Sequence, residues 1–371
     1  MARVLGLGLA AALLLGACDQ VRFPSADEVL PGESEVEAPV TEAEVDADEP
    51  EGVSAPVGEV TPQPNAQQVD TAELDPIEPP TPITDLAAIN ATLCGLPIRP
   101  IGESPTVAEA TRAQAPDEDS IDIQAVNGTA ATLTAFPGLV KMEPKEILPG
   151  GAIASGHCGA TRISETWFIT AAHCLDDDYD EVTLITGVDN LANPMAVRVS
   201  AVSSICHAAY GGAGGAYVND IALVRVPERE AAKLGAVPIA RFGESDAALV
   251  PFNYETADMA GWGITSFAGS LSNQLLTTRL EMTGTGPAAI GVASINGAGP
   301  CIGDSGGPLY VTEESGERTV VGVLSVVEQN MTTGGFCEGE YSARYTNVQG
   351  YLSWIEDVIA ACDSGNGLCG Y

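Results

Sequence analysis

Three short strings in the second half of the chain place a histidine, an aspartate and a serine in an order that could support acyl transfer. They are Thr170-Ala-Ala-His173-Cys, Asn219-Asp220-Ile-Ala-Leu and Gly303-Asp-Ser305-Gly-Gly-Pro. A serine hydroxyl is a weak nucleophile at neutral pH and needs a base, such as imidazole, within hydrogen-bond reach. The imidazole needs a carboxylate on its other nitrogen, which fixes the tautomer and stabilises the imidazolium. We therefore expect Ser305 to be the nucleophile, His173 its base and Asp220 the orienting carboxylate.

The serine string also fits the Gly-x-Ser-x-Gly turn of α/β-hydrolases. That arrangement requires a histidine after the serine in the chain. The chain has three histidines, and the last of them is His207. The α/β-hydrolase interpretation is therefore excluded. The order Asp, His, Ser of subtilisin-like enzymes is not formally excluded, but nothing around the earlier aspartates supports it.

Taken together, the three strings resemble the chymotrypsin/trypsin family of serine endopeptidases. The resemblance runs from about Ala125 to Ala360 and includes Ala260-Gly-Trp-Gly263 and the segment from Tyr345 to Ile355. It implies an all-β fold of two six-stranded antiparallel barrels with a C-terminal helix and the site in the cleft between the barrels. It also implies hydrolysis of proteins or peptides through an acyl-enzyme at Ser305. The alternative is a non-catalytic binding protein on the same fold, and the intact set of three residues argues against it.

The resemblance assigns roles to further residues around the nucleophile. The backbone N–H groups of Gly303 and Ser305 would form the oxyanion hole, and Ser325 would hydrogen-bond the carboxylate of Asp220. No cofactor or metal is expected. The acidic run Asp176–Glu181 could bind calcium, but a solvated loop that repels acidic substrates is the favoured interpretation. A metal at His157 with Cys158, or at Cys206 with His207, is disfavoured in the same way.

The resemblance also implies a specificity pocket, formed by Gly299, Pro300, Val327 and Ala343. Members that select basic side chains carry an aspartate six residues before the nucleophile, where this chain has Gly299. A lysine or arginine side chain buried there would lack a partner and keep its desolvation cost. Val327 stands where trypsin-like pockets have glycine, so it narrows the mouth. We expect cleavage after small or medium uncharged residues, unless the carboxylate of Glu338 or Glu340 reaches the pocket and restores a basic preference.

The string Ala125-Val-Asn-Gly-Thr resembles the N-terminus that the family gains when a zymogen is cleaved. The resemblance implies that the amine of Ala125 then pairs with Asp304 and completes the oxyanion hole. Ala125 is smaller than the usual isoleucine, and Gln124 precedes it in place of a basic residue. No trypsin-like activator is implied, and a form that is active without processing stays open.

Nine cysteines indicate an oxidising compartment, provided that the chain is exported. Spacing alone cannot give the pairing of the eight that follow Cys18. The resemblance pairs Cys158 with Cys174, and Cys301 with Cys337. Cys362 and Cys369 could close a small loop after the helix, and Cys94 and Cys206 then remain as the last pair.

The secondary-structure pattern agrees with a loop-rich all-β domain. Aromatic residues are only 5% of the chain and glycines number 41, which disfavours a helical bundle. Four short valine-rich segments bounded by Gly, Pro or Asn predict strands, at 182–186, 196–202, 221–226 and 320–327. A single helix is predicted, over 352–361.

Charge divides the chain into two parts. The net charge is −36, and residues 19–124 hold 24 acids and three bases. Between Phe23 and Phe136 there is no aromatic residue, and eleven prolines lie between Pro24 and Pro82. Such a segment cannot bury enough apolar surface to offset the entropy of ordering it, so residues 18–90 are predicted to be a disordered acidic tether. The charge also excludes nucleic acid as the default partner.

The N-terminus predicts how the chain is anchored. A basic start at Arg3 precedes an unbroken run of 14 apolar or small residues, Val4–Ala17, which fits a signal peptide and is too short for a membrane span. The run ends Leu15-Gly-Ala-Cys18, which is similar to a bacterial lipobox and predicts lipidation of Cys18. We expect a signal peptide over 1–17, a pro-segment over 91–124 and a protease domain over 125–371. The protein would be an exported monomer, attached to the bacterial envelope through lipid alone and facing the periplasm or the exterior.

Overall fold

The structure is a computed structural model of the chain. It describes residues 85–96, 126–242, 255–267, 269–330, 333, 335–364 and 369. All of these lie in the second of the two units into which the chain divides, 76–371. The predicted signal peptide, Cys18, most of the predicted tether and Ala125 lie outside the described residues. In the described ranges, no helix is long and apolar enough to cross a bilayer.

In the described part of the chain, the first sheet has nine strands in the order β1-β9-β10-β6-β5-β3-β7-β8, with β4 paired to β3. The strands are β1 (Ala91–Leu93), β3 (Leu139–Ile147), β4 (Ile153–Ser155), β5 (Cys158–Arg162), β6 (Trp167–Thr170), β7 (Glu181–Thr186), β8 (Val197–Ser200), β9 (Ser203–His207) and β10 (Ala222–Arg225). Strands β8 and β9 follow each other in the chain, and the two residues between them bond to the strands on either side. Ala201 N–H donates to Val182 O of β7, and Val202 N–H donates to Arg225 O of β10. The sheet therefore wraps into a ring of six strands, β3, β5, β6, β10, the β8–β9 stretch and β7.

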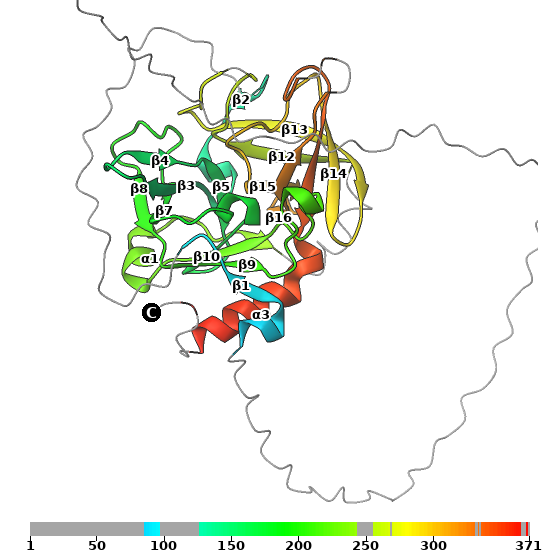
Figure 1. Cartoon of the computed structure of the whole chain (residues 1–371). Helices are drawn as coiled ribbons and strands as arrows, with labels where there is room; N and C mark the ends of the chain where they lie inside the picture. The colour runs from blue at the N-terminus through cyan, green and yellow to red at the C-terminus, as the bar shows by residue number, and fades with distance from the viewer. Residues whose placement is uncertain are drawn as a thin grey trace, which may run out of the picture. The chain divides into compact units, whose positions relative to one another are not determined.

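The second sheet closes by direct strand pairing. It has eight strands in the described ranges, and β16 pairs with both β15 and β17, so that β12 to β17 form a closed barrel of six (Figure 1). The strands are β2 (Thr129–Ala130), β11 (Arg241–Phe242), β12 (Thr256–Gly261), β13 (Leu276–Thr285), β14 (Ala289–Ser294), β15 (Pro308–Thr312), β16 (Arg318–Val327) and β17 (Ser342–Asn347). Alternate residues of β14 are buried, as expected for a barrel wall with one wet face. The prediction of an all-β fold with two six-stranded barrels is confirmed.

Short helices connect and cover the barrels. They are η1 (Leu86–Ile89), η2 (Leu133–Ala135), η3 (Ala172–Leu175), η4 (Ala213–Gly215), α1 (Glu228–Leu234), η6 (Val348–Tyr351) and α3 (Leu352–Asp363). The buried residues of α3 recur with the spacing of one helical face, so this helix covers the first barrel. The helix predicted over 352–361 is confirmed. Helix α1 was not predicted, because its seven residues are too few to show a helical period.

The segment before the predicted protease domain is part of the fold. Helix η1 begins after Asp85, whose carboxylate caps it through the N–H of Ala87, and β1 then pairs with β9. The indole of Trp354 in α3 donates to the carbonyl of Asn90. The predicted tether boundary at residue 90 is therefore wrong. Residues 85–90 belong to the folded part because Leu86 and the following strand bury apolar surface against the first barrel.

Four disulfides join the described cysteines in pairs. They are Cys94–Cys206, Cys158–Cys174, Cys301–Cys337 and Cys362–Cys369. The first joins β1 to the first barrel, and the second and third lie beside the predicted catalytic and specificity residues. These links therefore fix the loops that the chemistry needs.

Candidate active site

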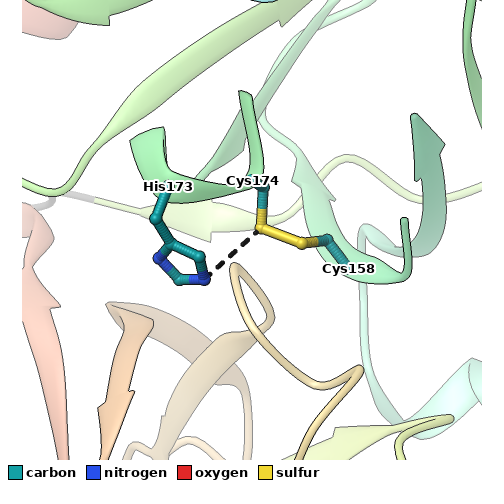
Figure 2. A group of neighbouring side chains, drawn as sticks. All are labelled: Cys158, His173 and Cys174. Carbon is teal, nitrogen blue, oxygen red and sulfur yellow. Dashed lines mark hydrogen bonds between the residues drawn. A yellow bond between two sulfur atoms is a disulfide. The ribbon is translucent and has the colours of Figure 1, made fainter. Parts of the chain in front are cut away.

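His173 lies in η3, a single turn between β6 and the acidic loop. Its neighbours Ala172, Cys174 and Leu175 are buried, while the histidine side chain keeps 18% of its surface exposed. The disulfide from Cys174 to Cys158 ties this turn to β5 (Figure 2). The neighbours of His173 in this turn are thus buried, and the histidine side chain is left partly exposed.

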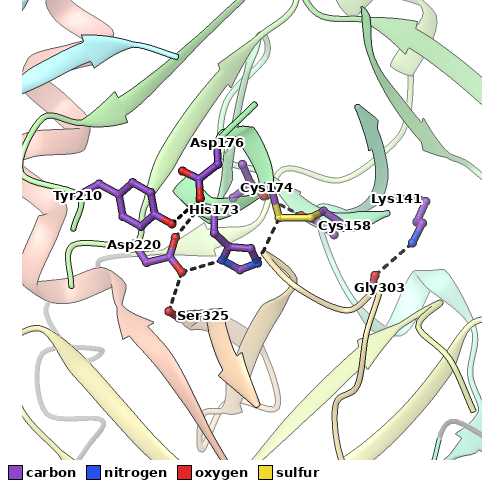
Figure 3. The surroundings of a disulfide bond; sticks show 11 residues. Lys141, Cys158, His173, Cys174, Asp176, Tyr210, Asp220, Gly303 and Ser325 are labelled. Atoms are coloured by element: carbon purple, nitrogen blue, oxygen red, sulfur yellow. Dashed lines mark hydrogen bonds and ion pairs between the residues drawn. A yellow bond between two sulfur atoms is a disulfide. The ribbon is translucent and has the colours of Figure 1, made fainter. Parts of the chain in front are cut away.

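Asp220 is the fully buried carboxylate of the site. One of its oxygens accepts from the backbone N–H of His173 at 2.9 Å, and the other lies 2.8 Å from His173 Nδ1 (Figure 3). The hydroxyl of Ser325 donates to that second oxygen at 2.6 Å. Ser325 stands at a bulge of β16, where the register with β17 shifts. Residues from both barrels therefore donate to the same carboxylate.

This geometry fixes the tautomer of the histidine. An ionised carboxylate is an acceptor only, so His173 Nδ1 must carry the proton that it shares with Asp220. The other ring nitrogen, Nε2, is then a free acceptor in the neutral ring. Its contact with Cys174 Sγ, at 3.8 Å, supplies no proton because that sulfur is bonded to Cys158. Nε2 is thus available as a base.

Ser305 stands on a tight turn that is pressed against the histidine segment. Gly306, with φ of +74°, has no room for a side chain, because a Cβ would collide with Thr170 Oγ1 and with the carbonyl of Gly159. The carbonyl of Ser305 accepts from the N–H of Gly159 at 2.7 Å. Among the described residues, no hydrogen bond joins the Ser305 hydroxyl to the His173 ring. Such contacts are often longer in ligand-free enzymes and tighten when substrate binds.

The turn that precedes the nucleophile is built around the buried carboxylate of Asp304. Its oxygens accept from the N–H groups of Gly263 at 2.8 Å and Cys301 at 3.0 Å. A Cβ on Gly261 or Gly263 would collide with this carboxylate, which explains both glycines of the Gly-Trp-Gly string. Burial raises the pKa of Asp304, and the two N–H donors and the charge of Lys141 oppose that rise. The ordered turn carries the N–H groups of Gly303 and Ser305 that were predicted to bind an oxyanion.

The predicted pocket residues lie together at one end of the second barrel. Val327 and Ala343 are directly opposite each other on β16 and β17. At Gly299 a Cβ would lie 2.6 Å from the hydroxyl of Tyr341, and that hydroxyl donates to the carbonyl of Pro300 at 3.0 Å. Tyr341 therefore closes the space beside Gly299. This role could not be predicted, because Tyr341 lies 42 positions from Gly299 in the chain and only the disulfide Cys301–Cys337 and the strand register bring the two together.

Among the described residues, no hydrogen bond joins Glu338, Glu340 or Asp176 to the catalytic set, although Asp176 lies near enough to His173 and Asp220 for their charges to interact. Ala125 lies outside the described residues, so its ion pair with Asp304 stays a prediction. Glu338 and Glu340 are exposed, and the Glu340 carboxylate accepts from the hydroxyl of Ser294 at 3.1 Å. Asp176, in the acidic loop, accepts from the hydroxyl of Tyr210, and burial raises its pKa.

The two sulfurs and the ring of Cys158, His173 and Cys174 lie close enough together to suggest a metal site (Figure 2). Cysteine binds metals as a thiolate. Here both sulfurs are consumed by one disulfide, so they offer no thiolate to an ion. The group is a structural link beside the histidine.

Sequence reasoning missed one charged residue of the site. Lys141 is 2% exposed on β3, and its ammonium donates to the carbonyl of Gly303 at 3.1 Å (Figure 3). A lysine between Val140 and Met142, in the apolar first half of the strand, was the available signal.

Comparison with known proteins agrees with the geometry. A solved structure of HL collagenase has a TM-score of 0.50 and 24% identity, over 63% of this chain and 98% of that one, which shows the fold to be chymotrypsin-like. The family model for trypsin matches residues 125–355, and the chain belongs to the trypsin family of serine proteases.

This chain aligns with nearly the whole length of two curated relatives. Fibrinolytic enzyme isozyme C of Lumbricus rubellus is 28% identical over 257 residues, covering 62% of this chain and 98% of that protein. Chymotrypsin-like elastase family member 1 of Felis catus is 28% identical over 264 residues, covering 66% and 93%. Proteases of this family that carry disulfides are typically secreted, and their substrates are proteins or peptides.

Proposed function

We propose that this chain is an active serine endopeptidase that forms an acyl-enzyme at Ser305. The observation that carries the proposal is the buried carboxylate of Asp220, which accepts from His173 and from Ser325 at the same time. Such a carboxylate holds the imidazole in the tautomer that a serine nucleophile needs. A binding protein on this fold would have no need to keep it.

The reaction would follow from these positions. The Ser305 oxygen attacks the substrate carbonyl as its proton passes to His173 Nε2, and the N–H groups of Gly303 and Ser305 stabilise the resulting oxyanion. As the intermediate collapses, His173 gives the proton to the departing amine, which leaves an ester on Ser305. Water then attacks this ester with His173 as base, and the proton returns to Ser305 as the acid product departs.

The pocket supports a preference for small or medium uncharged residues before the scissile bond. Val327 narrows the mouth, and Gly299 and Tyr341 offer no carboxylate to a basic side chain. A buried lysine or arginine would keep its desolvation cost there. The similarity to a chymotrypsin-like elastase is consistent with this preference.

The proposal extends to the whole chain. Residues 1–17 would direct export, Cys18 would carry the lipid, an acidic tether would lead to the fold at residue 85, and residues 125–371 would form the protease domain. Two or more acyl chains anchor a protein firmly, where one alone binds only weakly. The catalytic domain would thus work as a monomer at the envelope surface, at a distance set by the tether.

Hydrolysis of an internally quenched peptide tests the activity. Ser305→Ala should fold normally and lose turnover by about 10⁶-fold, the size of the loss when a serine protease loses its nucleophile. Ser315→Ala is the matched control, because Ser315 is exposed in the turn between β15 and β16. If the wild-type chain binds peptide without cutting it, the non-catalytic alternative is correct.

A further inference from the structure

Lys141 connects the first barrel to the oxyanion turn of the second. Its ammonium reaches the carbonyl of Gly303, 162 positions away in sequence, and the side chain is almost completely buried (Figure 3). Lys145 lies on the same strand but is partly exposed and pairs with Glu143 at the surface. Only the first of these two lysines therefore enters the interior.

The bond from Lys141 fixes a single peptide unit. The carbonyl of Gly303 and the N–H of Asp304 belong to the same planar group, so holding the carbonyl restrains the rotation of Gly303 about its own backbone bonds. Gly303 has φ of +94°, and a Cβ there would lie 2.6 Å from Leu271 Cδ2. The N–H of Gly303 is one of the two donors proposed for the oxyanion. Lys141 is thus placed to hold that donor in its working direction.

Lys141 also provides positive charge for a buried carboxylate. In the described part of the chain, Lys141 is the charged group that lowers the pKa of Asp304, and the other favourable contacts are the neutral N–H groups of Gly263 and Cys301. Burial lowers the pKa of Lys141 to about 8, and the carboxylates of Asp304 and Glu143 oppose that change. A buried pair of charges is costly, and apolar residues in place of both partners would often be neutral or stabilising for a fold. Keeping Lys141 and Asp304 together is therefore explained better by a role in the reaction than by a role in folding.

We propose that Lys141 is a positioning residue that completes the oxyanion hole from within the fold, so that the chain is active without a newly cleaved N-terminus. In the family pattern the charge beside Asp304 comes from a terminal amine released by cleavage, here that of Ala125. Lys141 supplies it permanently. This inference rests on the proposed peptidase activity and concerns how that activity is controlled.

The first test compares variants of the full chain, with the bond between Gln124 and Ala125 shown by intact mass to be uncut. The uncut wild-type chain should hydrolyse the quenched peptide. Lys141→Met should lower kcat by about 100-fold or more, the loss typical of one oxyanion donor, with KM changed only a few-fold. Because this variant leaves Asp304 buried without a charged partner, its thermal midpoint should fall, so kcat is measured where circular dichroism shows the variant to be folded. A merely structural lysine does not predict a loss confined to kcat. Lys145→Met, the control on the same strand, should keep kcat within twofold.

The second test uses pH and does not depend on the methionine variant folding. Lys141 is protonated below its pKa of about 8 and loses its charge above it, so wild-type kcat should fall above that pH while the fold persists. The charged groups that face Lys141 are Asp304 and Glu143, with His157 nearby. Lys141→Arg should shift this fall in kcat, the alkaline limb of the pH profile, to higher pH, because arginine stays protonated throughout the range.

The outcomes separate the two proposals. Unchanged kcat in Lys141→Met, or an uncut wild-type chain that is inert until Ala125 is exposed, overturns the role of Lys141 and leaves the peptidase proposal standing. An alkaline limb that stays in place in a folded Lys141→Arg chain also counts against it. If neither the uncut nor the processed wild-type chain cuts peptide, the peptidase proposal itself fails.

Discussion

Two groups of the candidate site are held by neighbours that lie outside the three sequence motifs. Asp220 is held by Ser325, and Gly303 by Lys141. The motifs around His173, Asp220 and Ser305 could be predicted because each is a local string whose residue types serve one reaction. Lys141 and Tyr341 could not, because their importance arises only when distant strands fold beside the serine turn. Lys141 stands out in the sequence only as a charge between two apolar residues, and Tyr341 carries no local signal of its role.

The pocket gives a prediction at the level of one side chain. On peptides with Ala, Val, Phe or Arg before the scissile bond, the wild-type chain should favour Ala or Val. Val327→Gly should raise kcat/KM for the Phe peptide relative to the Ala peptide by at least about tenfold, because a few methyl groups in an apolar pocket carry discrimination of that size. Val326→Gly should leave this ratio unchanged, since successive side chains of a strand point to opposite faces. A higher kcat/KM for the Arg peptide in the wild-type chain would refute the pocket assignment.

Among the elements, the strands could be predicted better than their limits. The segments predicted at 182–186 and 320–327 correspond to β7 and to most of β16. Valine favours the extended backbone, and the flanking turn residues mark where such a strand ends. The strand predicted over 196–202 is β8, which ends at Ser200 because the two residues that follow it bond to different neighbouring strands before β9 begins. The helix and strand over 86–93 were missed because each has only three or four residues, too few to show a helical or a strand period. Their order comes from pairing with β9 and from the disulfide at Cys94.

The disulfide between Cys94 and Cys206 gives a prediction for the segment that precedes the protease domain. If the chain is cut at a protease site inserted between Ala110 and Thr111, both pieces should stay joined and separate only on reduction. In Cys94→Ser the pieces should separate in denaturant without reductant. The unfolding free energy of the uncut variant should also fall by roughly 2–4 kcal/mol, as for other long disulfide loops.

The control for this experiment is the double substitution Cys362→Ser and Cys369→Ser. Both cysteines lie on the same side of the cut, so their disulfide cannot join the pieces. The cut control chain should therefore behave as the wild-type chain does. Two species from the wild-type chain under non-reducing denaturation would contradict the linkage.

For the whole molecule, the net charge opposes attachment to a membrane, and the predicted lipid would provide that attachment. With a net charge of −36, the protein is repelled by anionic membrane surfaces, so any attachment must come from lipid. The catalytic domain would remain bound to the envelope even after cleavage of the pro-segment, because Cys94 keeps it joined to the tether. Anchoring and retention would then depend on two cysteines, Cys18 and Cys94.

Fractionation of cells tests the anchor. The wild-type chain should sediment with membranes and stay there in high salt, whereas Cys18→Ser should appear in the soluble fraction. Ser305→Ala serves as the control, because it changes the nucleophile and leaves the N-terminus intact. Persistent membrane association of a signal-processed Cys18→Ser chain would show that the lipid assignment is wrong.

The most direct test of the central claim is covalent labelling by a fluorophosphonate, followed by intact mass and peptide mapping. Only a serine activated by its base reacts quickly with such a probe. The wild-type chain should gain one adduct, on the peptide that contains Ser305. Ser305→Ala should gain none, and His173→Ala should react far more slowly. A wild-type chain that stays unlabelled both uncut and processed, or an adduct mapped to another residue, would contradict the assignment of Ser305 as the nucleophile.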